Sequence, residues 1–142
     1  MRALFDVNVL IALFDPAHVH HERAHQWLEV SKESGWATCP VTQNGCVRIL
    51  SQPRYPNAIS VPEAIGRLGD ATSQPQHEFW HDDVSIVDAG LFSADRILSA
   101  RQLTDLYLLA LAIAHQGRLI TFDKGIPLIA VTGARTAHLV IL

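Results

Sequence analysis

The sequence has little cysteine and no long hydrophobic run. Its two cysteines, Cys39 and Cys46, form neither a zinc-binding motif nor a convincing disulfide framework. Acids or a glycine interrupt the apolar stretches before they reach the ~18 residues of a membrane span. The amino terminus is apolar, but Asp6 lies inside it and no small-residue cleavage site follows, which argues against a secretory signal. These absences favour a cytoplasmic protein without a membrane segment.

The chain also lacks an excess of positive charge. It has 11 basic and 14 acidic residues, which give a net charge of −3. A global basic field, which attracts nucleic acid without regard to sequence, is therefore absent. An enzyme that presents a phosphodiester to a metal ion needs local basic contacts instead, so this class is weakened but not excluded.

The composition predicts a globular chain that forms one domain over residues 1–142. Of its 142 residues 49% are hydrophobic and 18% charged, which is typical of a folded protein. Short strands alternate with helices, which favours an α/β fold with a largely parallel sheet. The expected strands are 2–6, 36–39, a short one around Phe79, 84–87, 118–122 and 138–142. The expected helices are 7–14, 18–34, 42–51, 62–72 and 93–99, with a further helix after Thr104.

Residues 104–123 predict a helix, a turn and a strand with an acid at each end. Thr104 is suited to cap the helix, and Asp105 falls in the first turn, where the helix dipole favours a carboxylate. Gly117 can end the helix in a left-handed conformation. Residues 118–122 then form a buried strand that Asp123 follows. Ligands of open α/β sheets bind beyond the carboxyl ends of the strands, so the two acids are expected to face one another across a cleft.

Asp6 is a third acid at the end of a predicted strand. Asn8 follows two residues later, with a side chain that can bond to backbone or to a metal-bound water. Three clustered carboxylates would repel one another, and a hard cation such as Mg²⁺ removes that penalty. Such an ion can also activate water for attack on a phosphodiester.

A different metal chemistry is suggested by the predicted helix 18–34. Residues 21–25 (HERAH) match the H-E-x-x-H pattern of zinc metalloproteases, in which His21 and His25 would share one helical face. The pattern fixes only three positions in a histidine-rich stretch, and no further ligand motif follows it. The alternative is an ordinary polar helix face, on which these histidines are not ligands.

Four segments of the chain stand out together, in the order LFDVNVLIAL, CPVTQNGCVRIL, LTDLYLLALA and LITFDKGI. Taken together they resemble PIN-domain proteins, and more narrowly the VapC-type toxins of bacterial toxin–antitoxin pairs. The resemblance covers nearly the whole chain. It implies a PIN-like three-layer α/β/α fold and a Mg²⁺- or Mn²⁺-dependent endoribonuclease that cuts structured RNA such as tRNA or rRNA. It also implies a VapB-type antitoxin that occupies the site, and a homodimer.

Carried over by position, the catalytic and metal-binding acids of the family fall on Asp6, Asp105 and Asp123. The family usually has a further acid, a glutamate, early in the helix after the second strand, where this chain has Gln43. Gln43→Glu is therefore expected to tighten metal binding, and a PIN-like domain that has lost catalysis and binds RNA or a partner is an alternative function. Residues expected to support the metal site are Asn8, Gln43 and Thr121. Candidates for RNA phosphate contacts are Arg48, Arg101 and Lys124.

Overall fold

The computed structural model describes residues 1–142, which form five β-strands and five α-helices. The strands are β1 (Ala3–Phe5), β2 (Trp36–Thr38), β3 (His77–Phe79), β4 (Arg118–Thr121) and β5 (Leu139–Ile141). The helices are α1 (Val7–Phe14), α2 (His21–Ser31), α3 (Pro40–Leu50), α4 (Val61–Thr72) and α5 (Leu103–Ala114). No helix is both long and apolar enough to cross a bilayer. Cys39 and Cys46 are buried and unpaired, as predicted.

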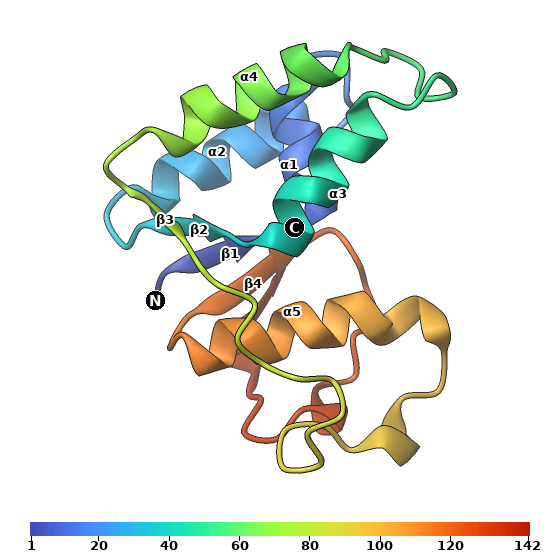
Figure 1. The fold of residues 1–142 in the computed structure, drawn as a ribbon. Helices are drawn as coiled ribbons and strands as arrows, with labels where there is room; N and C mark the ends of the chain where they lie inside the picture. Colours follow the sequence, from blue (N-terminus) through green and yellow to red (C-terminus); the bar gives the residue numbers. More distant parts are fainter.

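All five strands are parallel and lie in the order β3-β2-β1-β4-β5. Helices α1 to α4 cover one face of the sheet and α5 covers the other (Figure 1). The predicted three-layer α/β/α architecture is therefore confirmed.

Successive side chains of β1 point to opposite faces of the sheet and pack into a separate hydrophobic core on each face. Leu4 packs in the core beneath α5, which includes Leu109. Ala3 and Phe5 point the other way into the core under α1, which includes Leu10. Because successive strand residues face opposite sides, a fully buried strand must be apolar on both. The uninterrupted apolar residues of β1 follow from this position at the centre of the sheet.

The strand order places a switch point between β1 and β4. The chain moves outward from β1 through β2 to β3, then returns to β4 on the other side of β1. Ligand sites of open α/β sheets lie outside the carboxyl ends of the strands at such a point. Asp6 follows β1 directly, and Asp123 lies two residues after the last residue of β4.

Between β3 and α5 the predicted strand 84–87 is wrong, and the predicted helix 93–99 is much shorter than expected. Residues 84–87 form no strand, because the chain here crosses from the β3 edge to the face covered by α5. Val84 packs partly into the core beneath α5, whereas Val87 is 86% exposed. The predicted helix 93–99 is reduced to one 3₁₀ turn, η1 (Ala94–Arg96), and Ser93 makes no capping bond.

The two ends of α5 differ in detail from the prediction. Thr104 lies inside the helix, because a 3₁₀ turn, η2 (Ala100–Gln102), leads into it and is capped by the Ser99 hydroxyl. The left-handed residue after the helix is Gln116, with φ 57°, and not Gly117. Gly117 is required for close packing instead, since a Cβ there would lie 2.6 Å from the carbonyl oxygen of Arg2.

Candidate active site

Three carboxylates meet at the switch point of the sheet. Asp6 lies at the start of α1, Asp105 in the first turn of α5, and Asp123 beyond β4. One carboxylate oxygen from each lies within 4.8 Å of the others, and no other group of three or more metal-ligating side chains is this close. The fold therefore brings together the acids that the sequence placed at the ends of separate elements.

Asp6 is held by hydrogen bonds to both of its carboxylate oxygens. It is only 4% exposed. The hydroxyl of Thr121 donates to Oδ2 at 2.7 Å, and the backbone N–H of Val7 donates to Oδ1 at 2.6 Å. These donors fix the orientation of the carboxylate at the end of β1.

Asn8 and Thr121 join Asp123 to the same network. The Asn8 amide donates to Asp123 Oδ2 at 3.1 Å and to the Thr121 hydroxyl oxygen at 3.2 Å. Its carbonyl accepts from the N–H of Phe122 at 3.2 Å, and Thr121 accepts from the N–H of Asp123 at 3.0 Å. Asn8 thus ties the first turn of α1 to the chain after β4.

The electrostatics of the cluster favour a cation. Burial, followed by the charges of Asp6 and Asp123, raises the pKa of Asp105 to about 7. Burial also raises the pKa of Asp6, and the hydrogen bonds from Thr121 and Val7 only partly oppose it. The carboxylates therefore resist simultaneous ionisation until a positive charge is present. A set of ligands made only of carboxylate oxygens matches hard ions such as Mg²⁺ or Mn²⁺.

Two open hollows are lined by these carboxylates. The first, which we call the acid hollow, has a volume of about 370 Å³ and contains Arg48 beside the three acids. The second, the basic hollow, has a volume of about 390 Å³ and contains Arg101 and Lys124 with Asp105 and Asp123. None of these three basic residues takes part in an ion pair, so all are available to an anionic ligand.

Gln43 is the one predicted site residue that lines neither hollow and makes no hydrogen bond to the acids or to their partners Asn8 and Thr121. The α3 residues that line the acid hollow are Val41, Gly45, Arg48 and Ile49, a helical spacing that marks one face. Gln43 lies about 200° around the helix from Val41 and therefore on the opposite side. Its amide donates instead to the Thr38 hydroxyl at 2.9 Å. A hydrogen bond at the end of β2 thus replaces the expected approach to a metal.

Gln43→Glu is consequently expected to leave the affinity for Mn²⁺ within about twofold of the original, because the new carboxylate would not face the cation. Thr38 Oγ1 accepts from Gln43 and also contacts Nε2 of His77 at 2.8 Å. When Nε2 carries no proton, the Thr38 hydroxyl donates to it. Burial lowers the pKa of His77. A carboxylate at position 43 would require the hydroxyl to donate to it, which favours protonated His77 and raises its pKa. NMR titration of His77 and calorimetry with Mn²⁺ measure the two effects.

The control for this experiment is Gln43→Ala, which removes the hydrogen bond without adding charge. It is expected to leave the metal affinity unchanged as well. Metal binding that becomes several-fold tighter with Glu and not with Ala would show that the side chain turns to the cation.

The histidines at the start of α2 do not form a metal site. Nδ1 of His21 is hydrogen-bonded to the carbonyl oxygen of Ala12 at 2.8 Å. The His21 and His25 rings contact each other edge-on, with centroids 4.4 Å apart, and no third ligand joins them. A polar helix face explains the HERAH segment better than a zinc site does.

Sequence reasoning missed the residues that shape the hollow around the acids. Thr104 lines it beside Asp105, and Gly45 lets α3 approach α1 closely, since a Cβ there would lie 2.7 Å from a Val7 methyl carbon. The signal was present in the i, i+4, i+7 spacing of Val41, Gly45 and Arg48. This spacing alone does not indicate a functional site, because the three residues can be assigned to one only when the acids opposite them are known.

Comparison with known sequences identifies this arrangement. The family model described as PIN domain matches residues 3–131. Ribonuclease VapC44 of Mycobacterium tuberculosis is 56% identical over 142 residues, which is all of both chains. Ribonuclease VapC39 of the same organism is 43% identical over 127 residues, which cover 89% of this chain and 91% of the relative.

Two solved structures share the fold. VapC20 of Mycobacterium tuberculosis, described as a sarcin-ricin loop cleaving toxin, has a TM-score of 0.57 at 12% sequence identity, covering 87% of this chain and 89% of the other. VapBC2 from Rickettsia felis, bound to a DNA fragment from its promoter, has a TM-score of 0.53, also at 12% identity and with the same coverage.

Proposed function

Because this chain belongs to the PIN-domain family, and within it to the VapC-type toxin ribonucleases, we propose that Asp6, Asp105 and Asp123 hold one divalent cation for the hydrolysis of RNA. The observation that carries the proposal is the convergence of the three carboxylates at the switch point. A divalent cation bound there supplies Lewis acidity toward the phosphodiester and the attacking water. Mg²⁺ or Mn²⁺ suits the oxygen ligands.

The protein's own residues set the geometry of this reaction. Thr121 orients Asp6, and Asn8 orients Asp123, through the hydrogen bonds described above. Both residues act through the acids and are positioning residues. Arg48 on one side and Arg101 with Lys124 on the other would hold the RNA phosphates that flank the cleaved bond.

We further propose that the protein acts in the cytoplasm as one domain over residues 1–142 and cleaves structured RNA such as tRNA or rRNA. Its partner would be a VapB-type antitoxin that covers the acids, and its working form a homodimer. The full-length likeness to VapC44 and the shared fold of VapBC2 support an antitoxin partner.

The direct test is cleavage of purified cellular RNA with Mg²⁺, with Mn²⁺, with Zn²⁺ and with EDTA. Cleavage that depends on Mg²⁺ or Mn²⁺ and stops in EDTA supports the proposal. Retention of zinc after dialysis, together with metal-independent or absent RNA cleavage, would contradict it.

Gln43 motivates one second candidate, a PIN-like domain that binds RNA or its antitoxin but cleaves slowly. Its amide replaces the acid usual in the family and is bonded to Thr38. Tight RNA binding with cleavage near the uncatalysed rate at saturating Mn²⁺ would favour this function.

Arg48→Ala, Arg101→Ala and Lys124→Ala are each expected to weaken RNA binding about three- to tenfold. Each should also reduce the slope of log Kd against log salt concentration by about 0.7, because each removes one phosphate contact to a single strand. Fluorescence anisotropy with single-stranded RNA over a salt series measures both quantities.

Arg23→Ala is the matched control for these variants. Arg23 is exposed on α2 and lines neither hollow, so its removal should change neither affinity nor slope. An equal effect of Arg23 and Arg101 would show that only the overall charge matters.

A further inference from the structure

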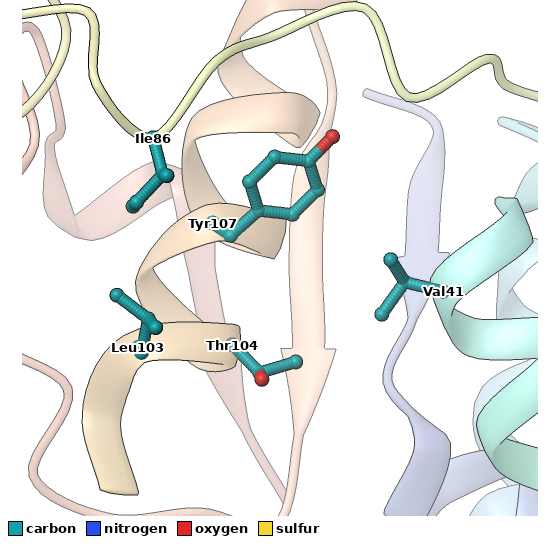
Figure 2. A pocket seen from close by; sticks show the side chains of 5 residues that line it. All are labelled: Val41, Ile86, Leu103, Thr104 and Tyr107. Carbon is teal, nitrogen blue, oxygen red and sulfur yellow. The ribbon is translucent and has the colours of Figure 1, made fainter. Parts of the chain in front are cut away.

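A third hollow opens beside the acid hollow and is chemically different from it. It has a volume of about 230 Å³ and lies between α3, the start of α5 and the segment after β3 (Figure 2). Its lining residues are Val41, Ile86, Leu103, Thr104 and Tyr107. Val41 and Thr104 also line the acid hollow, so the two hollows adjoin. We call this one the apolar hollow.

The walls of the apolar hollow suit an uncharged flat group. Four of its five lining residues are hydrophobic. The ring of Tyr107 lies between the side chains of Ile86 and Val41 in Figure 2. Ile86 and Leu103 are 39% and 43% exposed, so apolar surface faces solvent here. An aromatic ring flanked by aliphatic side chains is the kind of platform on which nucleobases stack.

The charges near the apolar hollow disfavour a phosphate. Burial, followed by the nearby charges of Asp82 and Asp83, raises the pKa of Tyr107 to about 12. Negative charge beside apolar walls repels the RNA backbone but does not repel a neutral base. The free basic side chains lie in the other two hollows, where the backbone would run.

We infer that the apolar hollow binds one nucleobase of the RNA, next to the phosphodiester held at the acids. This inference rests on the proposed ribonuclease function. The volume is below the ~300–1,000 Å³ of pockets for drug-sized ligands, which suits a single base. A base can enter only when it is unstacked and unpaired. The substrate class is therefore RNA with an unpaired nucleotide adjacent to the cleaved bond, such as a loop of a structured RNA.

The acid hollow adjoins both of the other hollows. The apolar hollow shares Val41 and Thr104 with the acid hollow, and the acid hollow shares Asp105 and Asp123 with the basic hollow. The base would lie at one end of this series, the cleaved phosphodiester in the middle, and the departing backbone at Arg101 and Lys124.

Methyl groups in each hollow allow the inference to be tested without cleavage. The probes are adenosine 5′-monophosphate and ribose 5-phosphate, titrated into the full chain with Ca²⁺ and followed by methyl NMR. The base-bearing probe is expected to shift the methyl resonances of Ile86 and Leu103, which line the apolar hollow and neither of the other two, and ribose 5-phosphate is not. Ile49 reports on the acid hollow and Ile126 on the basic hollow. Shifts confined to Ile49 and Ile126 with both probes would overturn the base site and leave the acid site intact.

Filling the hollow provides the second arm of the test. Ile86→Trp is expected to remove the nucleotide-induced shifts and to lower kcat/KM on a random 20-nucleotide single-stranded RNA pool about five- to tenfold. Val87→Trp is the matched control, since Val87 adjoins Ile86 but does not line the apolar hollow. It should stay within about twofold of the original protein.

Three results would contradict the base site. Equal effects of the two tryptophan variants on RNA cleavage would do so. If Ile86→Trp converts a dimer to a monomer by sedimentation while the nucleotide shifts no methyl of the hollow, a second copy of the chain occupies it. An original protein that cleaves no RNA and shows no nucleotide-induced shift at Ile86 or Leu103 would contradict both the proposed function and the base site, whereas such shifts without cleavage would contradict the proposed function alone.

Discussion

Asp105→Asn is expected to reduce metal-dependent RNA cleavage at least a hundredfold while the fold stays intact. A carboxylate near 4 Å from a cation contributes about 4 kcal/mol per pair of unit charges at an effective dielectric constant near 20, before desolvation opposes it. A net loss of about 1–2 kcal/mol would weaken Mn²⁺ binding about five- to thirtyfold. Misplacement of the remaining charge in the transition state adds the larger kinetic loss. Calorimetry and cleavage at saturating Mn²⁺ separate the two effects.

The same variant should make the metal-free protein more stable at alkaline pH. The pKa of Asp105 is raised from 3.8 to about 7 in the folded protein, so the folded state holds a proton that the unfolded state has lost. Stability of the original protein therefore falls as pH rises from about 4 to 7, and the penalty is complete above pH 7. Asparagine has no such penalty. After solvent screening, we expect a gain of about 1–2 kcal/mol in the free energy of unfolding at pH 8 in EDTA.

Asp95→Asn is the control for both measurements. Asp95 is exposed in the turn η1 and lines neither the acid nor the basic hollow. It should change neither cleavage nor the pH dependence of stability. Asp105→Asn with cleavage at the original rate would contradict the metal assignment. A destabilised metal-free protein at pH 8 would contradict the electrostatic account.

The gathering of the acids could be predicted because it depends on topology alone. Asp6 and Asp123 follow buried strands, and parallel strands end at the same edge of the sheet. Asp105 lies in the first turn of α5, the helix that leads into β4, and therefore at that same edge. Apolar strands and the helices between them are local patterns, and the elements that carry the three acids could be predicted from such patterns.

The errors arose where a residue's role depends on a distant neighbour. Gln43 was expected near the metal from its place in a motif, but its amide donates a hydrogen bond to the hydroxyl of Thr38 at the end of β2. Gly117 was predicted as a left-handed stop, whereas its lack of a side chain makes room for Trp80 and the Arg2 backbone. Residues 84–87 are apolar enough for a strand, yet they are used to cross the molecule.

The apolar hollow could not be predicted from the sequence for the same reason, because its residues are brought together only by the fold. Val41, Ile86 and Tyr107 come from three separate parts of the chain and form one wall only after folding. Each would be assigned to the core from its sequence alone. Recognition surfaces built from hydrophobic side chains are therefore harder to predict than acids, whose burial demands a reason.

Thr121→Val is expected to lower the free energy of unfolding by about 2–4 kcal/mol, although the two side chains have nearly the same shape. Thr121 is fully buried, and its hydroxyl donates to Asp6 Oδ2 at 2.7 Å. It also accepts from Asn8 and from the N–H of Asp123. Valine leaves a buried carboxylate with a single donor and removes an acceptor from two N–H groups, and such unsatisfied groups cost their full desolvation. Urea denaturation in EDTA measures the loss.

Thr121→Ser separates the hydroxyl from the methyl group. Serine keeps the donor and the acceptor and loses one buried methyl group, which costs about 1 kcal/mol. It should bind Mn²⁺ as the original protein does. Valine should bind it more weakly, and the deficit should be larger at pH 6 than at pH 8, because loss of the Thr121 bond raises the pKa of Asp6 further and a proton then competes with the metal. Equal metal affinities for the serine and valine variants at pH 6 would mean that Thr121 only fills space, and that Asp6 is oriented by the backbone of α1 alone.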